Sequence, residues 1–199
     1  MPLLTRKSRV LLPFISLLLL SSLAIANTQH PPQQRSDDPA SVIKTTLQKV
    51  TVFSSNSDKV KPVQLRGFIE NQIIPHFDFD NMSHWITGRF ANNMTEKDRI
   101  DFQRSLRETF LSSLAKHLGS FDAHNTRFRF YPARYRGPSE AFVSTTVYRP
   151  DMINVRLDFR MRRNGNDWKI IDIKANGSSA VLYYRRHFIS QLRNYRKTY

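Results

Sequence analysis

Histidines and acidic residues are the side chains of this sequence whose chemistry could support metal binding or acid–base catalysis. The six histidines are His30, His76, His84, His117, His124 and His187. None of them forms an H-x-x-x-H pair or an H-E-x-x-H motif, the spacings that place two ligands on one face of a helix. Asp78 and Asp80 could hold a cation, but helix capping explains both residues. The sequence therefore predicts no metal site and no cofactor.

Motifs for nucleophilic catalysis and for nucleotide binding are also missing from the sequence. The chain has no cysteine, which excludes disulfides, thiol nucleophiles, cysteine-ligated zinc, Fe–S clusters and a lipoprotein anchor. No G-x-S-x-G elbow, P-loop or G-x-G-x-x-G occurs. We therefore predict that the protein is not an enzyme. An acid–base pair of Asp158 with a histidine remains the alternative.

The charge of the chain indicates an anionic partner. Lysine and arginine number 31 against 16 acidic residues among 199, giving a formal net charge of +15. Such a balance suits nucleic acid, an anionic lipid surface or an acidic protein.

The N-terminal residues predict export. The basic residues Arg6, Lys7 and Arg9 precede an apolar run over 10–20, and small residues lead to A-I-A at 24–26. This order is typical of a cleaved secretory signal peptide over 1–26, and the apolar run is too short for a permanent membrane span. Cleavage would lower the formal charge from +15 to +12. We expect a soluble exported protein, which disfavours nucleic acid as the partner.

The rest of the sequence predicts a flexible lead over 27–38 and a single domain over 39–199. The lead is polar and rich in proline and glutamine. Apolar residues then recur at helical spacing in several segments. The first expected helix starts at Pro39, and the second follows Pro62 and stops before Pro75. Three more helices are expected from about 79 to 88, over 96–118, and over about 179–195 at the end of the chain.

After residue 125 the apolar period changes from 3.6 to 2, which indicates strands. The expected strands cover 127–131, 142–148, 155–162 and 168–173, with a hairpin turn at Asn164-Gly165. The fold class is therefore α+β: helices packed on a curled four-stranded antiparallel sheet. Alternation places aromatic residues on the face under the helices and arginines on a solvent-exposed face, which disfavours base stacking and again predicts no nucleic-acid binding.

Several ordered segments are similar to the MlaC family, also called toluene-tolerance auxiliary proteins. The segments are 74–79 (IPHFDF), 86–90 (ITGRF), 155–159 (VRLDF), 168–173 (WKIIDI), 177–179 (GSS) and 184–188 (YRRHF). Ser178 and Ala180 depart from the family pattern, which has bulkier apolar residues there. The resemblance covers about 39–193.

The resemblance implies a soluble periplasmic carrier of phospholipid, with acyl chains in an apolar cavity between helices and sheet. It implies shuttling that maintains outer-membrane lipid asymmetry, with an outer-membrane lipoprotein–porin complex and an inner-membrane ABC transporter with an MCE-domain subunit as partners. We expect a monomer. The expected bound ligand is a glycerophospholipid. The expected lipid-binding residues are Phe68, Ile69, Ile73, Met82, Trp85, Ile86, Phe110, Leu114, Phe128, Phe130, Val155, Leu157, Phe159 and Met161.

Other residues have different expected roles. Trp168, Asp172, Gly177 and Ser179 are expected to be architectural, and Arg89 and Arg185 are candidates for the cavity mouth or a docking face. The alternatives are a carrier of another lipid such as a hopanoid, a pocket enzyme on a related cone-shaped α+β scaffold, and a basic binding module with a filled core.

Overall fold

The computed structural model describes residues 38–55, 61–150 and 152–198, all within the unit formed by residues 34–199. The predicted signal peptide (1–26) and nearly all of the predicted lead (27–38) lie outside the described residues. The helices are α1 (Pro39–Ser55), α2 (Pro62–Phe68), η1 (Ile69–Ile73), η2 (Ile74–His76), α3 (Phe79–Thr87), η3 (Gly88–Asn93), α4 (Glu96–Leu118) and α5 (Ala180–Thr198). The strands are β1 (Arg127–Phe130), β2 (Arg134–Tyr135), β3 (Glu140–Tyr148), β4 (Val155–Asn164), β5 (Asp167–Ala175) and β6 (Ser178–Ser179).

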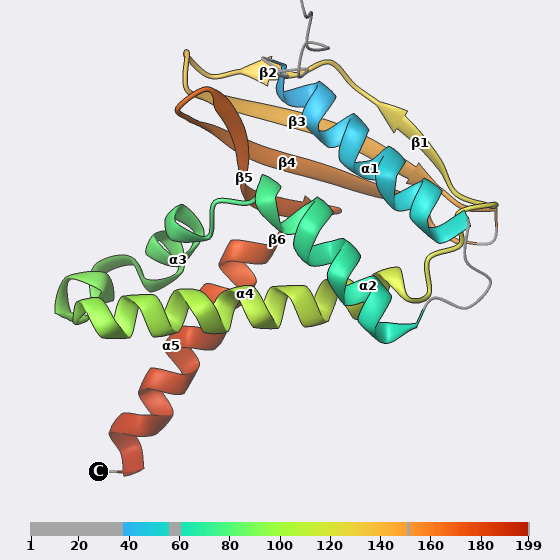
Figure 1. Ribbon diagram of the computed structural model, residues 1–199. Coiled ribbons are helices and arrows are strands. Elements are labelled where there is room, and N and C mark those ends of the chain that lie inside the picture. The colour runs from blue at the N-terminus through green and yellow to red at the C-terminus, as the bar shows by residue number, and fades with distance from the viewer. Residues whose placement is uncertain (1–37, 56–60, 151, 199) are drawn as a thin grey trace, which may run out of the picture. The chain divides into compact units, whose positions relative to one another are not determined.

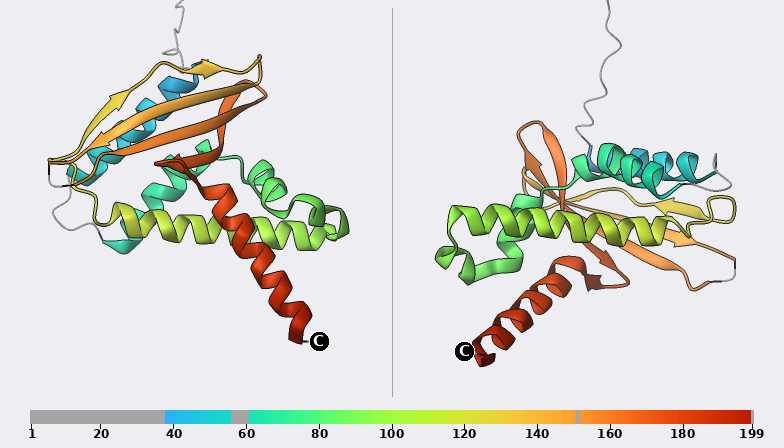
Figure 2. Two further views of the ribbon diagram at one scale, coloured as in Figure 1. Left: turned by 180° about the vertical axis from the view of Figure 1, so that it is seen from behind. Right: turned by 60° about the horizontal axis from the view of Figure 1, so that its bottom comes forward.

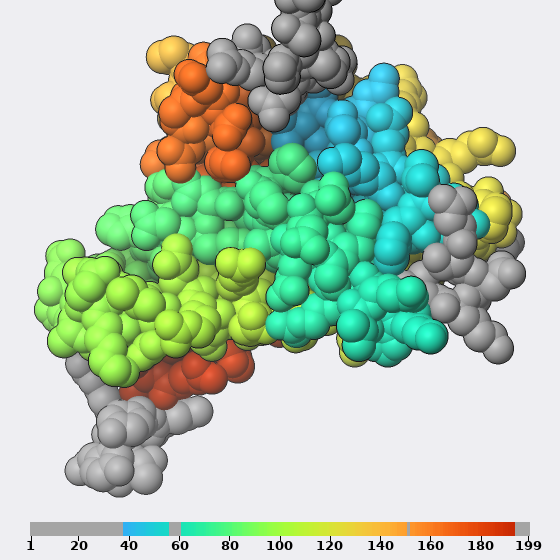
Figure 3. Space-filling view, in the orientation of Figure 1, coloured from blue at the N-terminus to red at the C-terminus, as the bar shows by residue number. Residues whose placement is uncertain are grey.

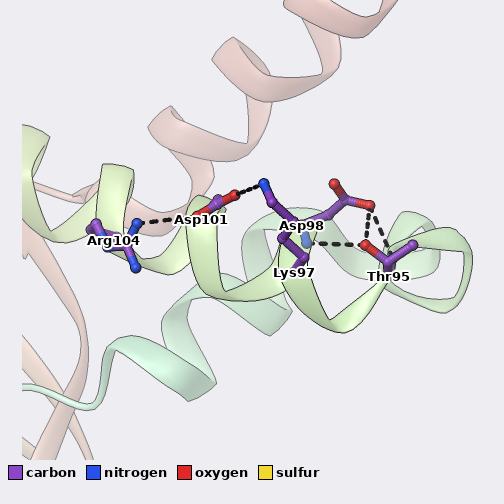
Figure 4. Close-up of polar contacts among 5 residues, drawn as sticks. All are labelled: Thr95, Lys97, Asp98, Asp101 and Arg104. Atoms are coloured by element: carbon purple, nitrogen blue, oxygen red, sulfur yellow. Dashed lines mark hydrogen bonds and ion pairs between the residues drawn. The ribbon is translucent and has the colours of Figure 1, made fainter.

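Side-chain caps fix where α1 and α4 begin. The carboxylate of Asp38 accepts hydrogen bonds from the amides of Ala40 and Ser41, both at 3.1 Å. At the start of α4, Thr95 Oγ1 accepts from the Asp98 amide at 3.1 Å, and Asp98 Oδ2 accepts from the Thr95 amide at 3.0 Å (Figure 4). This reciprocal pair is a capping box, with aspartate in place of glutamate. The predicted starts of both helices are confirmed.

Pro75 changes the end of the second helical segment. The sequence predicts a stop before this residue, but the backbone continues through the π-helical η1 and the 3-10 turn η2. Proline has no amide hydrogen, so it cannot complete an α-helical hydrogen bond. The turn before it widens instead, and the Ile74 amide donates to the carbonyl of Ile69. Ile69, Ile73 and Ile74 are all buried.

The sheet is antiparallel, and its order is β1-β3-β4-β5-β6, with β2 also paired to β3. The four predicted strands are present, and two two-residue strands, β2 and β6, raise the number to six. Val147 of β3 lies opposite Val155 of β4, and Phe159 of β4 lies opposite Ile173 of β5. The predicted hairpin turn is confirmed, since Gly165 between β4 and β5 has a φ of 60°.

A β-bulge interrupts the pairing of β4 with β5. Arg160 lies opposite Asp172, but the next residue, Met161, lies opposite Ile170, so Ile171 is an extra residue on β5. A bulge of this kind bends the strand and increases its local twist. Because of the extra residue, Ile170 and Ile173 face the same side although three positions separate them.

The two faces of the sheet contact different helices. α1 packs against β3 on one face, and Figures 1 and 2 show it running along the strands. α3 reaches the arginine face: the guanidinium of Arg160 lies 4.0 Å from the centre of the Trp85 ring, and Arg162 donates to Asn81 at 3.0 Å. The expectation of a fully exposed arginine face is therefore wrong at these two arginines. Exposed arginines on this face include Arg127, Arg129, Arg134 and Arg156.

One apolar core joins helices and sheet. Its members include Ile43 of α1, Ile69 of η1, Met82 of α3, Phe110 of α4 and Met161 of β4. In the view of Figure 3, the atoms of α1, α2, α3 and α4 form most of the surface, and the strands are visible mainly at its margins. α1, η1 and α4 therefore cover the apolar face of the sheet, as the alternating strand pattern predicts.

The junction of β5 with α5 is built as the sequence predicts. Ser179 Oγ accepts from the Leu182 amide at 3.1 Å and so caps α5. The same hydroxyl donates to Asp172 Oδ2 at 2.8 Å, and Asp172 Oδ1 accepts from the Val181 amide at 3.1 Å. The architectural roles predicted for Asp172 and Ser179 are confirmed.

Candidate functional site

An apolar cavity of about 670 Å³ lies between the sheet and the helices α1, η1 and α4. Three helical segments and four strands line it, together with residues of the adjoining loops. The lining residues are Ile43, Thr46, Leu47, Val50, Ile73, Phe77, Leu114, His117, Leu118, Ser120, Phe121, Phe128, Val147, Arg149, Met152, Val155, Leu157, Phe159, Ile170, Ile173 and Ala175. Most of these side chains are apolar, so the cavity suits an apolar ligand.

The periodicity of each element determines which of its residues reach the cavity. On α1, Ile43, Leu47 and Val50 recur at intervals of four and three, which keeps them on one side of the helix. The hydroxyl of Thr46, also on this side, donates to the Val42 carbonyl at 2.8 Å and therefore needs no partner in the cavity.

On the sheet, the side chains that reach the cavity come from alternate residues. Val155, Leu157 and Phe159 of β4 all line it, since successive side chains point to opposite faces. On β5 the bulge adds Ile170 to the side that Ile173 already occupies. The sheet thus supplies a continuous apolar wall along β4 and β5.

Apart from Thr46, the polar residues of the lining gather at one end of the cavity. His117 and Ser120 lie at and beyond the end of α4, and Arg149 directly follows β3. His117, Ser120 and Met152 are exposed, and Arg149 is half-buried. This end is therefore the mouth, where the cavity meets solvent.

Phe77 closes the cavity at the end farthest from the mouth. Its backbone forms a bridge with Ile170, and its ring lies 4.7 Å from the ring of Phe110 and 5.8 Å from that of Phe79, measured between centroids. Phe77 also lines a separate surface hollow of about 610 Å³, whose rim includes Arg104. A single aromatic side chain therefore belongs to the walls of both spaces.

The predicted site residues fall into three groups. Those that line the cavity are Ile73, Leu114, Phe128, Val155, Leu157 and Phe159. Those buried in the core, outside the lining, are Ile69, Met82, Ile86, Phe110 and Met161. Of the rest, Phe68 stacks on Phe53 with centroids 4.1 Å apart, Trp85 stacks on Arg160, and Phe130 lies beside Phe128 with centroids 6.1 Å apart.

Sequence reasoning missed the contribution of α1 and of the mouth. The apolar stripe of α1 was visible as a helical repeat, but nothing in its spacing says that it faces a hollow. Arg149 follows Val147 by two positions, and residues two apart on a strand point to the same face. This spacing could have placed Arg149 on the cavity side. His117 and Ser120 carry no comparable pattern.

Arg185 lies between α5 and α3 rather than in the cavity lining. Its Nη1 donates to the Trp85 carbonyl at 3.4 Å, and a Cβ added to Gly88 would lie 2.9 Å from its Nη2. Gly88 therefore makes room for this contact, and its φ of 54° is a conformation that favours glycine. Arg89 is also absent from the residues that line the cavity, so the structure does not place either arginine at the mouth.

Ion pairing shapes the arginine face beside α3. Arg160 Nε donates to Glu140, and this hydrogen bond lowers the pKa of the Glu140 carboxyl below its usual value. Burial lowers the pKa of His76, and the charges of Lys49 and Lys169 lower it further.

Within the described ranges, no group of three or more histidine or acidic side chains could hold a metal ion. No helix in the described part of the chain is long and apolar enough to span a membrane.

The fold and the cavity define the class of protein: an α+β domain whose antiparallel sheet and helices surround an apolar cavity. Residues 42–197 match the model of the MlaC protein family, and the chain belongs to this family. A similar solved structure is the phospholipid-binding protein from Ralstonia solanacearum in complex with a phospholipid. The two chains share 22% identity and a TM-score of 0.66 over 77% of this chain and 86% of the other. No curated protein sequence matches this chain. The predicted family and fold class are confirmed.

Proposed function

We propose that the protein is a periplasmic carrier that binds phospholipid acyl chains in the cavity and moves the lipid between membrane complexes. The observation that carries this proposal is the apolar cavity of about 670 Å³ with one polar, solvent-exposed end. An amphipathic lipid needs both features, since its chains avoid water and its headgroup requires it. Membership of the MlaC family and the lipid-bound Ralstonia solanacearum structure support the proposal.

The energetic requirement of a carrier agrees with this lining. Leaving acyl chains in water costs about 0.8 kcal/mol per methylene, so a chain of about 15 methylenes needs about 12 kcal/mol of compensation. The lining runs along β4 from Val155 to the level of Met161, which lies opposite the lining residue Ile170, and these seven residues span about 20 Å. One leaflet of a bilayer has a hydrocarbon thickness of about 15 Å, so the cavity wall is long enough for an acyl chain.

The lining favours a carrier over a pocket enzyme. The titratable side chains among the described residues that line the cavity are His117 and Arg149, and no carboxylate accompanies them. Asp158 lies on the arginine face, where it accepts a hydrogen bond from Ser144 at 2.6 Å and pairs with Arg156. The described residues of the cavity lining therefore contain no acid–base pair of a carboxylate with a histidine.

The protein's bound ligand tests the proposal. We expect native mass spectrometry of protein purified from its own periplasm to show one stoichiometric phospholipid adduct, and solvent extraction to release that lipid. A hopanoid adduct would support the alternative that the protein carries a lipid other than phospholipid. Protein that is free of lipid, and that takes up none from phospholipid vesicles, would contradict the proposal.

The same proposal assigns the remaining segments. Residues 1–26 are the signal peptide that directs export, 27–38 are a flexible lead, and 39–199 are one lipid-binding domain, monomeric in solution. The proposed docking partners are an outer-membrane lipoprotein–porin complex and an inner-membrane ABC transporter with an MCE-domain subunit. Transfer between them would maintain the lipid asymmetry of the outer membrane.

Exposed arginines are the proposed means of approach to anionic membrane surfaces. Arg129 and Arg156 lie on either side of Thr146 in the sheet register, and their guanidinium carbons lie 5.3 and 5.5 Å from the centre of the Tyr131 ring. Arg127 extends this group along β1.

We expect binding to phosphatidylglycerol vesicles to weaken as salt rises from about 0.01 to about 0.1 M, because the screening length falls from about 30 to about 10 Å. Co-sedimentation measures this binding. The double variant Arg127→Glu/Arg129→Glu should bind less at low salt, and phosphatidylcholine vesicles serve as the uncharged control. Binding that is independent of salt would rule out electrostatic approach.

A further inference from the structure

The distribution of polar groups along the cavity gives a ligand a fixed direction. The far end is apolar and closed by Phe77 and Ile170, whereas Arg149, His117 and Ser120 line the mouth. The strand register places these ends about 20 Å apart, because Val155 lies opposite Val147 near the mouth and Met161 lies opposite Ile170 near the closed end. An amphiphile can enter this space in one orientation, with its polar group beside Arg149.

Arg149 is placed at the mouth by the alternation of β3. Thr145 and Val147 precede it at intervals of two, and Val147 lines the cavity. The chain turns immediately afterwards, and the Met152 amide donates to the Arg149 carbonyl at 3.3 Å. The guanidinium is thus the one permanently charged group among the described residues that line the cavity. Arginine offers planar, paired donors that match the oxygens of a phosphate.

We propose that Arg149 binds the phosphate of the lipid headgroup and makes the cavity selective for phosphate-bearing lipids over neutral ones. This proposal rests on the proposed carrier function and extends it to a class of ligand. The imidazole of His117 offers a further hydrogen-bond donor at the same end, whereas the hydroxyl of Ser120 donates to the His117 carbonyl at 3.3 Å. An uncharged lipid with equal acyl chains fills the apolar part equally but gains nothing from the guanidinium.

A competition experiment tests this selectivity. Purified, delipidated protein is incubated with equal amounts of dioleoyl phosphatidylglycerol and dioleoylglycerol, and native mass spectrometry gives the ratio of the two adducts. We expect wild type to prefer the phospholipid, and Arg149→Gln to reduce that preference about tenfold, the effect of losing a charge-assisted hydrogen bond. Arg149→Lys should retain part of the preference. Arg136→Gln, an exposed arginine before β3 at the opposite end of the sheet, is the matched control and should match wild type.

The outcomes separate this proposal from the carrier function. If wild type takes up both lipids and Arg149→Gln has the same ratio, the assignment of Arg149 is overturned while the carrier function stands. If wild type takes up neither lipid, the carrier function itself is overturned. An added arm with inorganic phosphate distinguishes the source of the phosphate. Uptake of free phosphate that depends on Arg149, without any effect on the lipid ratio, would assign the site to phosphate alone and overturn headgroup binding.

Discussion

Replacing Leu157 and Ile173 together by tryptophan is expected to abolish lipid retention while the protein remains folded. Both side chains line the cavity from adjacent strands. Two indole groups would occupy space in which acyl chains are proposed to lie. Each methylene forced into water costs about 0.8 kcal/mol, so displacing as few as two methylenes weakens binding about tenfold. Native mass spectrometry of purified protein measures the loss of the lipid adduct.

The control for this variant is the next residue along β5. Lys174 is exposed and points to the opposite face from Ile173, so Lys174→Trp should leave the lipid adduct unchanged. Circular dichroism should show native secondary structure for both variants, because the new side chains enter existing space instead of a filled core. Full lipid occupancy in the folded double variant would show that the lipid binds elsewhere.

Replacing Asp172 by alanine is expected to destabilise the protein by about 3 kcal/mol. The side chain is buried, at 6% exposure. It accepts hydrogen bonds from the Ser179 hydroxyl and the Val181 amide, and the same hydroxyl caps α5. Removing the carboxylate leaves two buried donors without their acceptor, and each such loss costs about 1–3 kcal/mol. Urea denaturation measures the change in the free energy of unfolding.

Two variants on the same strand calibrate the effect. Asp172→Asn keeps one acceptor oxygen and should lose less stability than Asp172→Ala. Asp167→Ala removes a carboxylate whose side chain is 70% exposed and which approaches Lys169 only at 3.7 Å, so it should change stability by less than about 0.5 kcal/mol. Equal losses in Asp167→Ala and Asp172→Ala would contradict the role assigned to the buried network.

Local sequence patterns predicted most of the elements because their physical causes are local. Asp38 and the Thr95–Asp98 pair carry their own capping groups, and Gly165 meets the conformational demand of a hairpin turn. Alternation along β4 correctly placed Val155, Leu157 and Phe159 on the side facing the helices. These signals involve neighbours within a few residues and need no knowledge of the rest of the chain.

The position of the cavity could not be predicted in the same way, because it depends on how elements pack across long sequence separations. Met82 and Leu114 both carry the apolar signal of a helix face, yet Met82 is fully buried in the core and Leu114 lines the cavity. Trp85 looked equally apolar, but α3 brings its ring onto Arg160. The bulge at Ile171 lies in a pair of adjacent isoleucines, Ile170 and Ile171, and neither residue type marks which of the two is the extra one.

Under the proposed carrier function, the wall formed by Phe77 limits the length of acyl chain that the cavity accepts. The distance from Arg149 to Phe77 sets the length available to a chain whose headgroup is held at the mouth. A longer chain has to fold back or displace the Phe77 ring, which its contacts with Phe79 and Phe110 oppose. Phe77 also lines the second hollow, so we expect a rotation of its side chain to thin the wall between the two spaces. Chain-length preference and the route of lipid exit would then depend on the same residue.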